Sequence, residues 1–571
     1  MDHRRLLLLL IFSFSLVMLW DAWQKHNLPK APPVAASGTA EAPAPKPSGS
    51  LHTPLPGAPA PVAVATAEKA ETVTIATDLF TAEISLQGGD IVRLQLKDYR
   101  DSVNKERVFA LFEPKHQYYA QSGLIGDGLP NHKTRFSVAP GIRELSGDAQ
   151  EVVLRLEADA GNGVRVAKTY TFKRGSYLIG LKQEIENAGG KELVAHAYYQ
   201  LQRDVKAPDG ESSMVSTFTG PAVYTEQDKF QKVNFADIEA GKAKFATKAD
   251  NGWIAMIQHY FASAWIPEPG LPREFYMRKL ENSQTPAVAA GVIVPVPVAA
   301  PGTKVALEVP LYAGPQIQTT LDQLAKPKAD GGIGAQGLPL VVDYGWLTVI
   351  AAPIFWCLEA IYKVVGNWGW AIVILTIIIK LLFFPLSAAS YKSMAKMKTV
   401  TPRLMQLKER YGDDRQKLNQ EMMALYKREK INPLGGCLPI LVQIPVFIAL
   451  YWALLGAVEI RDAPWILWIK DLSAPDTLFG VIPVIDMPIG LLPIIMVASM
   501  ILQTKLNPTP PDPIQAKVML MMPYIFGIMF FWFPSGLVLY WVVNNILSIA
   551  QQWQITRMIE SGGKAANDSK A

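Results

Sequence analysis

Lys380 is the residue whose position most needs a chemical explanation, because it lies in the middle of a long apolar run. It is preceded by Thr-Ile-Ile-Ile at 376–379 and followed by Leu-Leu-Phe-Phe at 381–384. An ammonium group at this depth of a bilayer costs roughly 2.5–3.5 kcal/mol on insertion scales. Since the surrounding segment supplies no carboxylate, we expect Lys380 to face a hydrated cavity that can receive an anionic group. The alternative is a lysine whose side chain extends to a lipid phosphate.

Polar side chains also interrupt other apolar stretches of the chain. Thr376 lies four residues before Lys380, which puts both side chains on one face of a helix. Its hydroxyl could equally bond to a carbonyl of the preceding turn. Gln443 lies between Pro439 and Pro445 in another apolar run, where a buried amide needs a partner or water. A cavity or a hydrogen bond between helices would satisfy these groups.

A polar stripe follows the last apolar segment of the chain. Tyr540, Asn544 and Ser548 recur at every fourth position, beside Trp541. Such a stripe is typical of contacts between membrane helices, but together with Lys380 it favours one hydrated groove. The residues predicted to line this groove are Lys380, Thr376, Gln443, Tyr540, Trp541 and Asn544. A groove of this kind binds anionic groups without covalent chemistry.

No constellation of catalytic residues or metal ligands is evident in the sequence. The seven histidines lie outside the predicted spans and form no close pair with metal-ligand spacing. Cys357 and Cys437 are too few for a cysteine-built site. Scattered Glu and His residues in the region 71–330 could meet in space, although surface positions are the simpler interpretation. We therefore predict a protein that is not an enzyme and has neither a metal nor a cofactor.

Charge is distributed unevenly along the 571 residues. Hydrophobic residues make up 50% and charged residues 18%, against a typical charged share of about 25%. Lys517 and Arg557 bracket 39 residues without a charged side chain, whereas a membrane span needs about 20 apolar residues. The sequence is therefore that of an integral membrane protein. Its net charge of +5 does not indicate a specific nucleic-acid partner.

Five spans are predicted after an N-terminal apolar run that follows Arg4-Arg5 and lacks a cleavage site. The spans cover about 368–388, 434–456, 487–505, 517–533 and 536–554. The segment 389–433 has 11 Lys and Arg against 5 Asp and Glu, which predicts a cytoplasmic location, whereas 459–487 has 2 against 5. The N-terminus, the segment 389–433 and the segment 459–487 can all lie on their predicted sides only if 340–366 does not cross the membrane. We therefore predict that 340–366 is an amphipathic helix on the outer surface of the membrane. The result is six spans, with both termini in the cytoplasm.

The basic segment 389–433 has its own internal pattern. Apolar residues recur at three- to four-residue spacing before and after Tyr411-Gly412-Asp413-Asp414. This pattern predicts an antiparallel helical hairpin whose second helix is capped by an aspartate. We expect its cationic exterior to recruit partners through Lys392, Lys396, Lys398, Arg403, Lys408, Arg410, Arg415 and Lys417.

The region 71–330 follows the two-residue period of β-strands, which indicates a large β-sandwich domain outside the membrane. Strands are predicted at 81–86, 91–96, 152–157, 164–172, 177–186, 195–202, 292–298 and 305–311, and a short helix at 318–324. Ten prolines within 29–61 make 26–70 an extended linker to the N-terminal anchor, 1–25. The remaining parts are a helical core, 367–557, and a cytoplasmic tail, 558–571.

Several motifs in the C-terminal half resemble those of YidC-type membrane protein insertases. They are Asn367-Trp368-Gly369-Trp370, Pro385-Leu386-Ser387, Tyr391-Lys392-Ser393-Met394-Ala395-Lys396-Met397, Gln420-Glu421-Met422-Met423-Ala424-Leu425-Tyr426, Asn432-Pro433-Leu434-Gly435-Gly436-Cys437 and Trp532-Phe533-Pro534-Ser535-Gly536-Leu537. This match covers roughly 340–557, and the anchor and β-domain ahead of it resemble the Gram-negative form of the family. The resemblance implies a mixed fold. One part is a polytopic α-helical membrane region with six spans, five of which form the core. The other part is a periplasmic all-β supersandwich similar to sugar-binding domains of the galactose-mutarotase type.

The same resemblance implies a membrane protein insertase and chaperone of the bacterial inner membrane. Such proteins insert nascent membrane proteins, alone or with the Sec translocon, through a hydrophilic groove with a positive residue. Lys380 matches that residue, which is usually arginine, so the charge is kept and the bidentate geometry is lost. Trp541 stands where the family has a second tyrosine.

The partners expected from this resemblance are nascent clients, the Sec translocon, the lipid bilayer, and ribosomes or targeting factors at the hairpin. Two other functions stay open: a small-solute transporter and a membrane-tethered periplasmic sugar-binding protein. A transporter would normally show inverted repeats, and none is found among the predicted spans.

Overall fold

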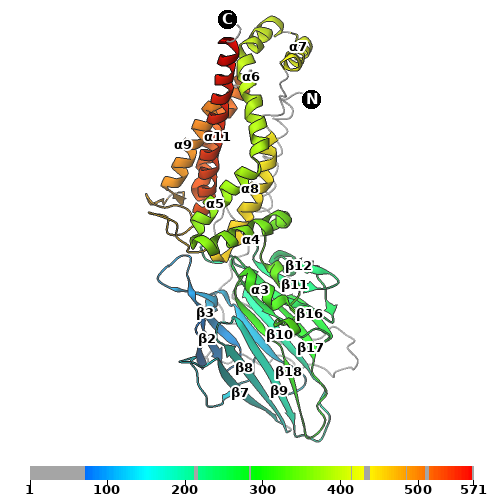
Figure 1. Cartoon of the computed structure of the whole chain (residues 1–571). Coiled ribbons are helices and arrows are strands. Elements are labelled where there is room, and N and C mark those ends of the chain that lie inside the picture. Colours follow the sequence, from blue (N-terminus) through cyan, green and yellow to red (C-terminus); the bar gives the residue numbers. More distant parts are fainter. Residues whose placement is uncertain are drawn as a thin grey trace. The chain divides into compact units, whose positions relative to one another are not determined.

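The computed structural model describes residues 71–568, except 162, 211–216, 282–284, 413, 430–437, 484 and 508–512. The predicted N-terminal anchor, 1–25, and the linker, 26–70, lie outside the described residues. The described strands and helices belong to one compact unit, in which a region rich in β-strands is followed by a helical region (Figure 1).

Two large antiparallel sheets make up the first region. The strands of the first sheet, in spatial order, are β1 (Thr72–Ala76), β2 (Phe80–Ser85), β3 (Ile91–Arg100), β5 (Tyr119–Ile125), β10 (His196–Asp204), β17 (Ala287–Pro295), β16 (Arg273–Lys279) and β13 (Lys248–Ala249), with β4 (Val108–Phe112) paired to β3. The strands of the second are β12 (Lys229–Lys232), β11 (Gly220–Thr225), β14 (Trp253–Gln258), β15 (Phe261–Trp265), β19 (Leu311–Pro315), β9 (Leu178–Asn187), β8 (Val164–Lys173), β7 (Glu151–Gly161) and β6 (Ser137–Val138), with β18 (Thr303–Glu308) paired to β9.

The sheets pack face to face, which agrees with the predicted sandwich. β7 alternates exposed and buried residues along its length, as expected for a strand with one solvated face. β10 and β14 are buried on both faces, and each is an interior strand of its sheet. The core between the sheets contains large side chains such as Phe80, Trp253 and Trp265, each fully buried. Burial of this apolar surface is the main favourable term in folding such a domain.

Helices and short 3₁₀ turns complete the chain. The α-helices are α2 (Phe235–Glu239), α3 (Gln318–Ala325), α4 (Thr348–Val365), α5 (Trp368–Leu382), α6 (Phe384–Tyr411), α7 (Arg415–Arg428), α8 (Leu438–Gly456), α9 (Leu491–Leu506), α10 (Pro513–Met529) and α11 (Ser535–Asp568). The 3₁₀ turns are η1 (Pro114–His116), η2 (Lys328–Asp330), η3 (Leu338–Val341), η4 (Gly345–Leu347), η6 (Val458–Ile460) and η7 (Phe530–Trp532). A short ribbon pairs β20 (Val481–Ile482) with β21 (Met487–Pro488) before α9.

The apolar helices depart from the predicted span boundaries, and two of these departures have a clear local cause. The segment 368–388 is not one straight helix, because α5 ends at Leu382 and a bend of 66° separates it from the first part of α6. Pro385 at the start of α6 lacks an N–H group and cannot continue the hydrogen-bond ladder of α5. The segment 487–505 becomes helical only at Leu491, since Met487 and Pro488 pair in the ribbon.

By length and composition, one described helix, α4, is apolar enough to cross a membrane. Taken together, α5 and the first part of α6 are also long and apolar enough to cross a membrane, with a bend between them. Shorter apolar helices lie at 443–456, 491–506 and 516–532. In Figure 1, α4 runs crosswise to α5 and α8, and it contacts both helices.

Candidate functional site

Lys380 is buried near the end of α5, with 8% of its surface exposed. The N-terminus of α5 is capped by Asn367, whose side chain accepts a 3.1 Å hydrogen bond from the Trp370 N–H. The Lys380 Nζ donates a 2.6 Å hydrogen bond to the Ser548 Oγ of α11. Among the described residues, no carboxylate oxygen lies within 4.0 Å of that Nζ, so its charge has no counter-ion there.

A narrow cavity lies beside Lys380, where α5, α6, α8 and α11 meet. Its lining residues are Ile379, Lys380, Phe383, Leu386, Ser387, Gln443, Val446 and Asn544. Its volume is about 20 Å³, which has room for about one or two water molecules. We call this space the Lys380 cavity. It brings together three of the residues predicted to line a groove: Lys380, Gln443 and Asn544.

Thr376 is not among the residues that line the Lys380 cavity. Its side chain is buried, and its hydroxyl donates a 2.7 Å hydrogen bond to the Ile372 carbonyl one turn earlier. This is the local bond that a threonine in a helix commonly makes. Thr376 therefore shares the helix face of Lys380 without offering a polar group to the cavity.

Tyr540 and Trp541 are packed against an aromatic side chain of α8. The Tyr540 ring stacks on Phe447 with centroids 6.1 Å apart, and Trp541 meets the same ring edge-on at 4.5 Å. The Tyr540 hydroxyl is buried and faces the Gln443 amide without a hydrogen bond of normal geometry. Neither Tyr540 nor Trp541 is among the residues that line the Lys380 cavity.

Three serines, Ser387, Ser499 and Ser548, take part in the polar contacts of this region and were not among the predicted groove residues. Ser387 lines the Lys380 cavity from α6. It lies beyond the bend between α5 and α6, so helical spacing from Lys380 did not indicate it. Ser499 of α9 accepts a 3.0 Å hydrogen bond from the Asn545 amide, which ties α9 to α11. That bond belongs to helix packing and not to the cavity.

The basic segment folds as α6 and α7, with a small apolar core of its own. Val400, Leu404 and Leu425 are buried between the two helices. The Asp414 carboxylate accepts a 3.0 Å hydrogen bond from the Lys417 N–H, which confirms the predicted aspartate cap. The described basic side chains are exposed: Lys392, Lys396, Arg403, Lys408, Arg410 and Lys417. The side chains of Lys398 and Arg415 lie outside the described part of the chain.

Comparisons with known proteins cover the full chain. Residues 72–357 match the family described as the YidC periplasmic domain, and residues 360–562 match the 60Kd inner membrane protein family. A membrane protein insertase YidC from Dechloromonas aromatica is 62% identical over 575 residues, with 100% of both chains covered. One from Aromatoleum aromaticum is 56% identical, with 98% of each chain covered. A solved structure of an active YidC insertase is 18% identical with a TM-score of 0.40, covering 86% of this chain and 93% of its own.

These findings define the class of protein: an inner-membrane protein with a large periplasmic domain, rich in β-sheet, that precedes a helical region. The chain belongs to the YidC family of membrane protein insertases. The resemblance predicted from the sequence motifs is thus confirmed, and so is the prediction that the protein is not an enzyme. The alternatives of a small-solute transporter or a tethered sugar-binding protein gain no support from these relatives.

Proposed function

We propose that this insertase receives the hydrophilic tail of a nascent membrane protein in the Lys380 cavity and releases the client's apolar helix into lipid. The observation that carries this proposal is the buried Lys380 ammonium, which has a hydroxyl partner and no described carboxylate within 4.0 Å. A charge without a counter-ion in an apolar region attracts an acidic side chain strongly, because the local dielectric constant is low. Gln443 and Asn544 offer amide groups to the same visiting tail.

The cavity must widen before it can hold a polypeptide tail, since about 20 Å³ has room for water only. Two features of the surrounding helices suit such a movement. The chain bends by 66° between α5 and α6, so α6 can change direction without breaking a continuous ladder of hydrogen bonds. Pro445 lies inside α8 and weakens the backbone hydrogen bonding of the helix that carries Gln443.

We also propose the topology that supports this route: six spans, both termini in the cytoplasm, and α4 on the periplasmic surface of the membrane. Support comes from the charge asymmetry of the loops. It also comes from α4 itself, which buries Ala351, Phe355 and Leu358 and exposes Trp356 by 68%. Tryptophan is enriched where protein meets the membrane–water interface. In this arrangement the α6–α7 hairpin is cytoplasmic and recruits ribosomes or targeting factors, while the Sec translocon delivers larger clients.

Photocrosslinking tests the proposed route. A photoreactive amino acid would replace Gln443 in the cavity, and a second variant would carry it at Leu520 on α10, where the side chain is 55% exposed. We expect the tail of a stalled short-tailed client to crosslink at 443 and not at 520. Crosslinking at 520 alone would contradict a route through the cavity and would favour insertion along the outer face of α10.

A further inference from the structure

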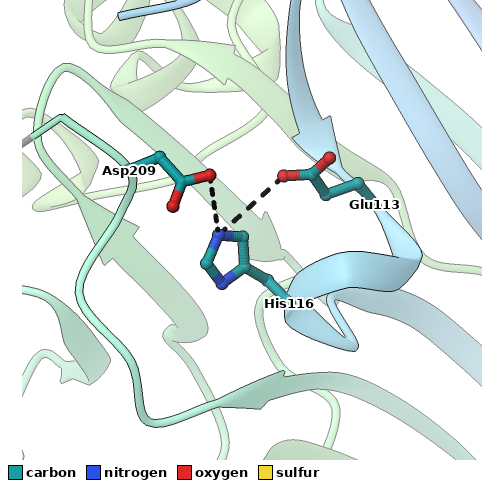
Figure 2. A group of neighbouring side chains, drawn as sticks. All are labelled: Glu113, His116 and Asp209. Carbon is teal, nitrogen blue, oxygen red and sulfur yellow. Dashed lines mark ion pairs between the residues drawn. The ribbon is translucent and has the colours of Figure 1, made fainter. Parts of the chain in front are cut away.

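A histidine and two carboxylates converge on one point of the β-domain, far along the chain from the residues of the Lys380 cavity. Glu113 and His116 lie at η1, and Asp209 lies in the segment that follows β10 (Figure 2). The His116 Nε2 is 3.9 Å from the Glu113 Oε1 and 3.7 Å from the Asp209 Oδ2. One ligand atom from each residue lies within 4.8 Å of the other two.

These distances suit a single small cation. Two ligand atoms that are each about 2.1 Å from one ion can be at most about 4.2 Å apart. Both histidine–carboxylate distances already meet this limit, and the ligand atoms of Glu113 and Asp209 lie within 4.8 Å of each other, a separation that rotation of the two side chains can reduce. Both carboxylates are partly exposed, at 27% and 41%, and therefore have freedom to move.

The imidazole of His116 is held in the orientation that metal binding needs. Its Nδ1 is 3.2 Å from the Oδ2 of Asp204, and the side chain of Asp204 is only 1% exposed. A carboxylate bonded to one ring nitrogen fixes the tautomer and leaves the other nitrogen free to bind a metal, which is the usual arrangement around metal-bound histidines. Figure 2 shows the ring of His116 directed toward Glu113 and Asp209, and the contact with Asp204 is made by the other ring nitrogen.

The side chain of a neighbouring residue, Lys115, already contacts one of the two carboxylates. The Lys115 ammonium pairs with the Asp209 carboxylate, but its side chain is 62% exposed and can swing into solvent. Next to Asp204, the Arg203 Nε is 3.9 Å from the Oδ1 of that carboxylate and is buried beneath the site. Asp101, Lys105, Arg461 and Asp471 line the same cavity, so five carboxylates stand against four cations when His116 is neutral. The local electrostatics therefore favour a divalent cation.

The space around the cluster is open enough for an ion and its remaining water ligands. Glu113, His116 and Asp209 line a cavity of about 220 Å³. Zn²⁺ commonly takes three protein ligands and leaves a fourth position to water. Ca²⁺ prefers six to eight oxygen ligands, which this cluster does not offer.

We propose that Glu113, His116 and Asp209 form a Zn²⁺ site on the periplasmic domain, with Asp204 as the residue that positions His116. The site goes beyond the proposed insertion route and is independent of Lys380. It predicts that the periplasmic domain binds one Zn²⁺ per chain, with the fourth ligand position open to the cavity.

Calorimetric titration of the full-length protein tests this site. The protein would be purified with a tag that contains no histidine, kept in detergent and treated with a chelator before Zn²⁺ is added. We expect saturable binding of one Zn²⁺ per chain, weakened at least about tenfold by His116→Ala or Asp209→Asn. Asp148→Asn, which changes an exposed aspartate elsewhere in the domain, should leave the affinity unchanged. Equal affinities for all four proteins would show adventitious binding and overturn the proposal.

Two further variants, Lys115→Met and Asp204→Asn, distinguish a metal-binding site from a cluster that only forms ion pairs. Removing the competing Lys115 ammonium should tighten Zn²⁺ binding, and Asp204→Asn should weaken it while the absorption spectrum of the Co²⁺-loaded protein still shows histidine ligation. If the cluster has only a structural role, Lys115→Met will lower the thermal stability without tightening Zn²⁺ binding, and the proposal is then wrong. Thermal unfolding of the metal-free variants identifies any variant that has lost its fold.

Discussion

Lys380 and Ser548 join two helices of the apolar region through a single 2.6 Å hydrogen bond from the ammonium to the hydroxyl. The Ser548 hydroxyl donates in turn to the Asn544 carbonyl at 2.7 Å, so it is available to the lysine as an acceptor. The ammonium is therefore hydrogen-bonded to α11 through Ser548. In the proposed route, an anionic group of a client would compete with Ser548 for this ammonium.

Ser548→Ala tests whether this bond holds the lysine at rest or is needed for insertion. We expect the variant to lose about 1.5–3 kcal/mol of stability, the usual value of a hydrogen bond made by a charged group. Insertion of clients with acidic tails should stay within about twofold of wild type, because the charge is retained. The measurements are thermal unfolding in detergent and insertion into vesicles. An insertion defect as large as that of a Lys380 variant would make Ser548 itself part of the client-binding site.

The charge of Lys380 should determine how acidic tails are handled. Lys380→Arg should support insertion, Lys380→Glu should be the most defective variant, and Lys380→Ala should fall between them because Gln443 and Asn544 remain in the cavity. An ion pair in a partly buried site contributes roughly 1–4 kcal/mol, so the loss for acidic tails should be several-fold or more. The measurement is crosslinking-verified insertion of clients that differ only in tail charge.

The neutral-tail clients in that series serve as the control, and they should be affected only mildly. Matched protein levels are needed, because Lys380→Glu also buries an acidic group. Equal activity of the Ala and Glu variants across the whole series would show that the lysine has a structural role, and the electrostatic part of the proposed route would then be wrong.

The sequence predicts the chemistry of the Lys380 cavity better than its geometry. Lys380, Gln443 and Asn544 stand out because each is a polar residue in an apolar run. Such a run can be recognised from the sequence alone. Whether a side chain faces a shared cavity depends on how separate helices pack, which no local spacing reveals. Thr376 satisfies the same spacing rule as Lys380, yet its hydroxyl bonds within its own helix.

In the β-domain, too, local sequence patterns predict some features, whereas others depend on contacts between residues far apart in the chain. The predicted strand 292–298 covers only the second half of β17, which begins at Ala287 and ends at Pro295. The first half consists of small residues buried on both faces, so it lacks the alternation that reveals a strand. Likewise, Glu113 and His116 are three residues apart, but Asp204 and Asp209 join them only through the fold.

The α6–α7 hairpin should be separable from the rest of the helical region. Its buried residues Val400, Leu404 and Leu425 form a core of their own. Deleting 400–425 should therefore leave a folded protein that still inserts into the membrane but delivers clients poorly. Membrane fractionation and client insertion measure the two effects. Loss of the protein from the membrane fraction would instead assign the hairpin a structural role.

The proposed topology predicts that two positions label from opposite sides of the membrane. In a variant without the native cysteines, Gly412→Cys at the end of α6 should react only from the cytoplasm, and Pro475→Cys between α8 and α9 only from the periplasm. The reason is the contrast between 11 basic residues in 389–433 and 5 acidic residues in 459–487. Labelling of both cysteines by an impermeant reagent added from one side would contradict the six-span arrangement.

Glu459 should make the stability of the periplasmic side pH-dependent. It lies in η6, and its Oε1 accepts a 3.3 Å hydrogen bond from the Gln318 N–H at the start of α3. Burial raises the pKa of Glu459 to about 7, with a smaller contribution from the negative charge of Glu359. The folded state therefore keeps a proton that the unfolded chain releases above about pH 4.5, so this contribution to stability is present at low pH and is lost as the pH rises through about 7.

Glu459→Gln cannot ionise and should match wild type near pH 5 but exceed its stability near pH 8, by on the order of 1–3 kcal/mol. Thermal unfolding at the two pH values measures this difference, with the exposed Glu226→Gln as a control that should show none. A constant difference between Glu459→Gln and wild type across this range would mean that Glu459 stays ionised in the folded protein and that its burial costs less than proposed.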